Sequence, residues 1–139
     1  MACPVHGPGG FADYAMDVAD ACHAGGIKPL AVTAGDIHAQ PRREFYSKMD
    51  AANVDLKAFT EEFYFRQTGA HLAPVLETLE FPVHETKVWT EITTLLIPGT
   101  NDSDEELEAE GRRIRRHRGQ DVPRPVTASH PNTKLKAAN

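Results

Sequence analysis

Segments typical of strands alternate with segments typical of helices along this chain of 139 residues. Four segments have strand character, near residues 27–33, 53–57, 88–97 and 122–128. Helical segments separate them, and strands joined in this way pair in parallel through right-handed crossovers. The alternation therefore predicts an α/β fold, with four adjacent parallel strands in chain order and helices on one face.

Each helical segment carries signals for its beginning or its end. Ser, Thr and Pro favour the first turn of a helix, and Gly favours the position after the last turn. In the last segment only Leu107 and Ile114 are sizeable apolar residues, so its buried stripe is expected to be thin. The expected helices run from Phe11 to the stop at Gly25-Gly26, from Pro41 to Met49, from Thr60 to Gly69, from Pro74 to a close near Pro82, and from the capping box Ser103-x-x-Glu106 through Arg118.

The composition bounds the class of protein. With 40% hydrophobic and 25% charged residues, the chain is typical of one soluble globular domain. It contains neither an apolar run near the ~20 residues of a membrane helix nor the pattern of a secretory signal. A net charge of −5 argues against broad binding to nucleic acid or to anionic membranes. Two cysteines, Cys3 and Cys22, do not make a disulfide scaffold, so we expect a reduced, cytoplasmic protein.

Alternate side chains of the two central strands separate into apolar and polar sets, which point to opposite faces. The apolar sets are expected to pack on the helices. The opposite sets contain Asp55, Lys57, Glu91 and Thr93, which would face the barrel interior. Polar groups are costly there unless they have partners or contact a ligand. A ligand site, a solvated open face and an internal Asp–Lys pair all remain open from this spacing.

The carboxyl ends of the strands gather candidate binding residues, because ligands bind at these ends in parallel α/β folds. A Thr and a Gly at a strand end can approach a ribose or a carboxylate closely, and a Lys can meet a carboxylate. The alternative is that Gly35 and Gly99 are only turn residues. The four ends are Thr33-Ala34-Gly35-Asp36, Asp55-Leu56-Lys57, Leu96-Ile97-Pro98-Gly99 and Thr127-Ala128-Ser129-His130.

Other motifs give weaker signals. Cys3-Pro4-Val5-His6 and Cys22-His23 could be the halves of a zinc site, but the adjacency of Cys22 and His23 strains tetrahedral geometry, and we expect no metal site. The arginine-rich run 112–118 is expected to be a solvated helix end. The chain contains no P-loop, no GxSxG motif and no dinucleotide fingerprint.

Several longer motifs resemble those of a known family. The motifs are Val32-Thr33-Ala34-Gly35, the run MDAANVDLKAFT at 49–60, the run EITTLLIPG at 91–99, Asn101-Asp102-Ser103-Asp104-Glu105 and Thr127-Ala128-Ser129-His130-Pro131. They are similar to motifs of radical S-adenosylmethionine proteins, in the branch of the pyruvate formate-lyase activating enzymes and in particular the AmmeMemoRadiSam group. The resemblance extends from about Phe11 to Lys136.

The resemblance implies a partial (β/α) barrel of the TIM type. In the family a [4Fe–4S] cluster held by CxxxCxxC cleaves S-adenosylmethionine reductively, and the resulting 5′-deoxyadenosyl radical abstracts hydrogen from a protein substrate or partner. By position, Thr33 and Gly35 resemble the strand end that contacts the ribose or the methionine. Asp55 and Lys57 resemble the motif beside the methionine carboxylate, and His130 resembles the last-strand histidine near the cofactor.

The chain departs from the family at the cluster site. It has no CxxxCxxC, and Cys3 and Cys22 are too few and too far apart to replace it. The first barrel strands of the family also have no counterpart here. We therefore expect a fragment truncated at both ends, with a loop-like N-terminus at 1–10, the partial barrel at 11–136 and a tail at 137–139.

Such a fragment is not expected to hold the cluster or to catalyse the reaction alone, and its first strand should offer an open edge for self-association. Two alternatives remain. One is a non-catalytic module that binds a nucleotide or a protein partner. The other is a different α/β barrel enzyme that uses Glu91 or His130 as acid–base groups.

Overall fold

The computed structural model describes residues 11–118 and 122–129. Four strands of this part of the chain form one sheet in the order β1-β2-β3-β4, and each neighbouring pair is parallel. The strands are β1 (Leu30–Thr33), β2 (Ala51–Asp55), β3 (Trp89–Leu96) and β4 (Val126–Ala128). The prediction of an α/β fold with the parallel strands of a partial (β/α) barrel is confirmed.

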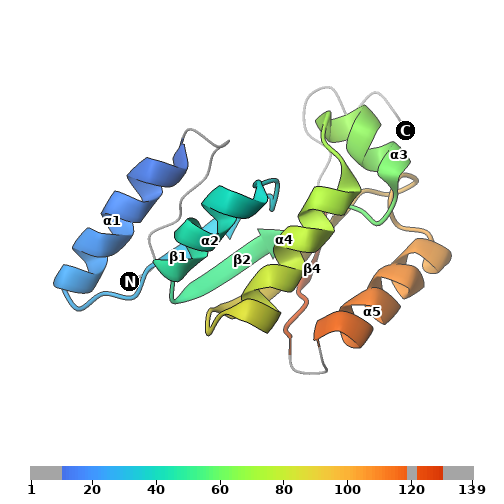
Figure 1. Cartoon of the computed structure of the whole chain (residues 1–139). Helices are drawn as coiled ribbons and strands as arrows, with labels where there is room; N and C mark the ends of the chain where they lie inside the picture. The colour runs from blue at the N-terminus through green and yellow to red at the C-terminus, as the bar shows by residue number, and fades with distance from the viewer. Residues whose placement is uncertain (1–10, 119–121, 130–139) are drawn as a thin grey trace.

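The helices form a row on one side of this sheet (Figure 1), as predicted. Along the row α1 contacts α2, α2 contacts α4, and α4 contacts α5. Thr60 caps the short helix between α2 and α4, because its Oγ1 accepts a hydrogen bond from Phe63 N–H, and the segment ends at Gly69 as expected. The helices are α1 (Ala12–Ala24), α2 (Ala39–Ser47), α3 (Glu61–Phe63) with the π-helical turn η2 (Tyr64–Thr68), α4 (Leu72–Glu85) and α5 (Asp104–Arg118).

The two outer strands are shorter than predicted because proline cannot donate to a strand ladder. β1 begins directly after Pro29, at Leu30. Before β4, the carbonyls of Pro123 and Pro125 still accept hydrogen bonds from the N–H groups of Ile92 and Thr94. The segment before β4 therefore follows β3, although only its carbonyl side contributes.

The predicted end of α4 near Pro82 is wrong, because the helix continues to Glu85. A proline inside a helix removes one backbone hydrogen bond. Here Pro82 is buried beside Leu79 and Phe81, which are also buried. The Thr86 hydroxyl donates to the Pro82 carbonyl at 2.6 Å. Burial of this apolar turn favours the longer helix over an early stop.

The hydrophobic core lies between the sheet and the row of helices. Every second residue is buried along β2 and from Trp89 to Thr94 of β3, so the predicted division into two faces is confirmed there. Val54, Leu56 and Ile92 are fully buried in the strands and the segment that leaves β2, and Val75 and Leu79 of α4 are buried as well. None of the helices in the described part of the chain is both long and apolar enough to cross a membrane.

The predicted domain limits stay predictions. The N-terminal segment 1–10 and the tail 137–139 lie outside the described residues, as does the end of the predicted barrel at 136.

Candidate functional site

A pocket of about 650 Å³ opens at the carboxyl ends of β1 and β2. Thr33 at the end of β1 lines it, as do Asp55 at the end of β2 and Lys57 in the segment that leaves β2. Tyr64 and Thr68 of the π-helical turn supply a further wall. Three of the five residues predicted from the sequence thus share one pocket, although they come from different strands.

Gly35 shapes the turn beside this pocket. Its φ of +78° is strained for any residue with a side chain, and a Cβ there would lie 3.1 Å from Val54 Cγ1 and 3.2 Å from Val75 Cγ1. Its N–H donates to Thr33 Oγ1 at 3.1 Å. These contacts support the turn interpretation of Gly35, and a direct contact with a ligand remains a prediction.

Asp55 and Lys57 form an ion pair in which Lys57 Nζ lies 2.8 Å from Asp55 Oδ2. Their side chains are 34% and 39% exposed, respectively. An ion pair with this much exposure to solvent contributes about 0–1 kcal/mol to stability, so the fold depends little on it. Because an ammonium has three N–H donors, the pair leaves Lys57 able to bind a ligand as well.

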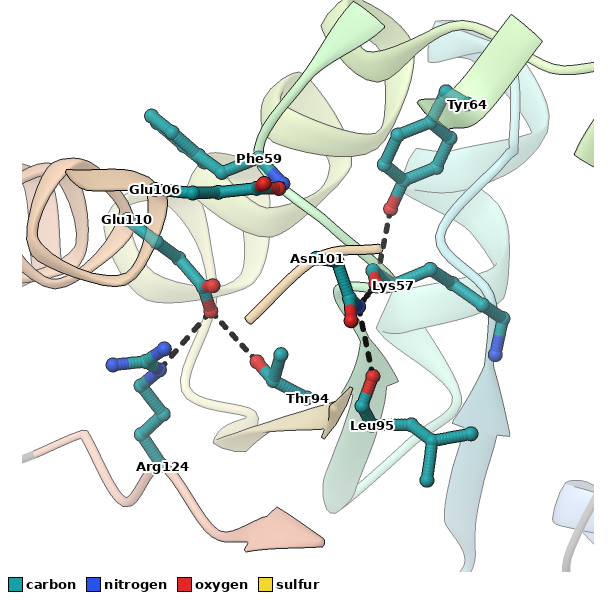
Figure 2. A network of polar contacts seen from close by, with 9 residues as sticks. All are labelled: Lys57, Phe59, Tyr64, Thr94, Leu95, Asn101, Glu106, Glu110 and Arg124. Atoms are coloured by element: carbon teal, nitrogen blue, oxygen red, sulfur yellow. Dashed lines mark hydrogen bonds and ion pairs between the residues drawn. The ribbon is translucent and has the colours of Figure 1, made fainter. Parts of the chain in front are cut away.

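The backbone of the segment that leaves β2 is held by side chains from other elements (Figure 2). Tyr64 accepts a hydrogen bond from Lys57 N–H at 3.0 Å, and Asn101 Nδ2 donates to the Lys57 carbonyl at 2.7 Å. Glu106 Oε1 accepts from Phe59 N–H at 2.6 Å. Burial raises the pKa of Tyr64 to about 12, so its hydroxyl keeps its proton at neutral pH.

A second polar cluster lies on the sheet face opposite the helices. Asn53 Nδ2 donates to Glu91 Oε1 at 2.5 Å and to Thr93 Oγ1 at 2.8 Å. All three side chains are half-buried. The polar sets predicted for this face are therefore present and linked to each other, and an acid–base role for Glu91 remains a hypothesis.

The sequence analysis missed Glu110. This residue of α5 is 1% exposed, and its carboxylate accepts from Thr94 Oγ1 at 2.6 Å and from Arg124 Nε at 3.0 Å. Burial raises the pKa of Glu110. The buried face of α5 thus includes a carboxylate beside its few apolar residues. A search for apolar periodicity cannot detect such a residue. Glu110 does not line the pocket at β1 and β2.

The capping box at α5 forms only in part. Ser103 Oγ accepts from Glu106 N–H at 3.2 Å, as predicted. In a full capping box the Glu106 carboxylate would accept from Ser103 N–H, but it accepts from Phe59 N–H. The residue that appeared to serve only its own helix therefore holds the segment next to Lys57.

Two histidines singled out in the sequence remain to be placed. His130 lies outside the described residues, so its predicted place near the cofactor stays untested. His23, from the weighed zinc motif, instead contacts Asp50 Oδ2 at 2.8 Å. Within 11–118 and 122–129 no three or more His, Cys, Asp or Glu side chains cluster closely enough to hold a metal ion.

Comparisons with known proteins place the fold. No family model matches the chain. An uncharacterized protein, MJ0808 of Methanocaldococcus jannaschii, is 28% identical over 125 residues, and the match spans 90% of this chain but only 36% of that protein. A crystal structure of a domain of pyruvate-formate lyase-activating enzyme from Bacteroides vulgatus ATCC 8482 is similar with a TM-score of 0.72. That match covers 96% of this chain and 88% of the other at 13% identity, so the predicted resemblance is confirmed at the level of the fold.

Proposed function

We propose that this chain is the S-adenosylmethionine-binding part of a radical S-adenosylmethionine protein similar to the activating enzymes and to the AmmeMemoRadiSam group. The pocket at the carboxyl ends of β1 and β2 is the observation that carries this proposal, because it unites Thr33, Asp55 and Lys57. The fold likeness to a domain of an activating enzyme supports it. By the same likeness, a protein substrate belongs to the activity of the whole protein.

The chemistry of the pocket suits a nucleoside that carries an amino acid. Small-molecule sites usually measure about 300–1,000 Å³, and this pocket measures about 650 Å³. The Lys57 ammonium can bind the methionine carboxylate, and the Asp55 carboxylate can bind the methionine ammonium. Thr33 offers a hydroxyl to the ribose, beside the turn at Gly35.

The residues of this chain do not fit the cluster. A CxxxCxxC site supplies three thiolates, and the chain has only Cys3 and Cys22. The thiolates would have to come from outside these 139 residues. The proposal for this chain is therefore limited to binding and orienting the nucleoside, and it includes no radical step.

Titration calorimetry with S-adenosylmethionine tests the proposal. We expect weak binding, and we expect Lys57→Ala to weaken it about tenfold, because a hydrogen bond to a charged group contributes about 1.5–3 kcal/mol when it is well shielded. Partial exposure of Lys57 places the loss at the lower end.

Lys87→Ala is the matched control. Lys87 is also a lysine, but it is exposed, and it precedes β3 and so lies at the amino-terminal ends of the parallel strands, away from the pocket at their carboxyl ends. Its removal should leave the affinity unchanged. Absence of binding at millimolar ligand would overturn the proposed function, and equal affinity of Lys57→Ala and the wild type would remove Lys57 from the site.

A further inference from the structure

Lys57 is held at both of its backbone polar groups by side chains that lie outside β2. Its N–H donates to the Tyr64 hydroxyl at 3.0 Å, and its carbonyl accepts from Asn101 Nδ2 at 2.7 Å. β2 ends at Asp55, so these two groups lie beyond the strand itself. Fixing both groups of one residue fixes the direction in which its side chain leaves the backbone.

The Asn101 side chain is itself fixed by burial and by hydrogen bonds. The side chain is 2% exposed, and it makes three hydrogen bonds. Besides its bond to Lys57, its Nδ2 donates to the Leu95 carbonyl at 2.8 Å, and its Oδ1 accepts from Ile97 N–H at 2.7 Å. Figure 2 shows the Asn101 side-chain amide between Lys57 and Leu95. Asn101 thus ties the residue at the pocket to the end of β3.

Tyr64 contacts the same residue from the other side. It is 2% exposed and lines the pocket, and its hydroxyl meets Lys57 N–H. A hydroxyl can accept and donate at once, so this contact leaves the Tyr64 proton free for another bond. Tyr64 and Asn101 come from different parts of the chain, and both bind the backbone of Lys57. The ion pair of Lys57 with Asp55 is too exposed to solvent to fix the position of Lys57 by itself.

We propose that Tyr64 and Asn101 are positioning residues, which orient Lys57 so that its ammonium meets the carboxylate of the nucleoside in the pocket. This inference rests on the proposed function. It assigns to both residues an effect mainly on one end of the ligand. The adenosine end should depend on them less.

Two ligands separate this role from a general structural role. S-adenosylmethionine carries the amino acid carboxylate, and 5′-methylthioadenosine keeps the adenosine but lacks that carboxylate. We expect Tyr64→Phe and Asn101→Asp to lower the affinity for S-adenosylmethionine roughly fivefold, less than loss of the ammonium itself. The affinity for 5′-methylthioadenosine should fall clearly less in both variants, because this ligand has no carboxylate for Lys57 to bind.

Tyr64→Phe removes only the hydroxyl and keeps the ring. Asn101→Asp keeps the acceptor for Ile97 N–H but removes the donors to the Lys57 and Leu95 carbonyls, and it buries a carboxyl group beside both. If Asn101→Asp does not fold, Tyr64→Phe alone decides the matter. Tyr14→Phe is the matched control, because Tyr14 is 62% exposed and does not line the pocket.

The outcomes distinguish the two proposals. A selective loss for S-adenosylmethionine, with binding by Tyr14→Phe unchanged, supports the positioning role. Equal losses for both ligands, or no loss for either, overturn the positioning role and leave the proposed function standing. If the wild-type protein binds neither ligand, the proposed function is wrong, and the positioning role is overturned with it.

Discussion

The two faces of the sheet use the same strands but different chemistry. On the helix side, Val54 and Ile92 are fully buried. On the opposite side of the same strands, Asn53 and Glu91 are half-buried, and Trp89 is 53% exposed. Neighbouring residues in a strand point in opposite directions, so two side chains that are adjacent in the sequence can differ completely in their exposure to solvent.

A carboxylate lies on each side of the sheet, and the two differ in how many protein hydrogen-bond donors replace water around them. Glu110 is 1% exposed on the helix side, where a hydroxyl from Thr94 and a guanidinium from Arg124 both donate to it. Burial still raises its pKa. Glu91 is half-buried on the open side, where the Asn53 amide donates to it and water can reach it. The helix side therefore governs stability, and the open side should tolerate change.

The largest expected effect tests this difference directly. Ile92→Ala removes a fully buried side chain from β3, and such changes lower the free energy of unfolding by about 2–5 kcal/mol. Leu95→Ala, in the same strand, should cost less than about 1 kcal/mol, because Leu95 is 41% exposed. Urea unfolding of both variants measures the two losses. Equal losses would contradict the division between the faces.

A smaller, pH-dependent effect is expected at Glu110. Because its pKa is raised in the folded state, the folded protein binds this proton more tightly than the unfolded chain does. The stability that comes from this group is complete below the ordinary pKa of 4.5 and falls as the pH rises toward the raised value. Glu110→Gln cannot titrate, so the wild type should lose stability relative to this variant as the pH rises through that interval.

Each unit of pKa difference contributes about 1.4 kcal/mol to this change. Urea unfolding between about pH 4 and pH 8 covers the interval. Glu108→Gln is the matched control, since Glu108 is exposed on the same helix and pairs with Arg112. A constant difference in stability between Glu110→Gln and the wild type across this range would show that Glu110 keeps its ordinary pKa.

The smallest effect is expected on the open face. Asn53→Ala removes two hydrogen bonds, to Glu91 and to Thr93, but water can replace them at half-buried groups. We expect a loss of about 1 kcal/mol in the free energy of unfolding. Thr93→Val removes only one of the two bonds, so it should cost less. A loss as large as that of Ile92→Ala would indicate that this face is as dry as the other.

Much of the fold followed from local patterns. The order of the four strands agrees with the sequence analysis, as does the burial alternation along β2 and most of β3, although β2 lies at 51–55 where 53–57 was predicted. The helix cap at Thr60 agrees as well. The end of α4 was wrong, because the burial of Pro82 and its neighbours outweighs the local tendency of proline to end a helix.

The candidate site was predicted in part. That Thr33, Asp55 and Lys57 lie together followed from the rule that the carboxyl ends of parallel strands meet at one edge of a sheet, and their binding of a ligand stays a prediction. Tyr64 was missed as a wall of the pocket, since nothing in a helical segment shows which strand end it will meet. Glu106 was interpreted only as a helix cap, although its carboxylate holds Phe59 N–H.

The sequence by itself determined the order in which strands and helices alternate, and which face of each central strand is apolar. These properties depend on neighbours within a few residues, so periodicity records them. Only the tertiary structure decided that Tyr64 and Asn101 meet Lys57, from seven and 44 residues away. It also decided that Glu110 would be buried against Thr94, 16 residues away. A hydrogen bond between distant residues requires that packing first bring their elements together, and no local pattern encodes that distance.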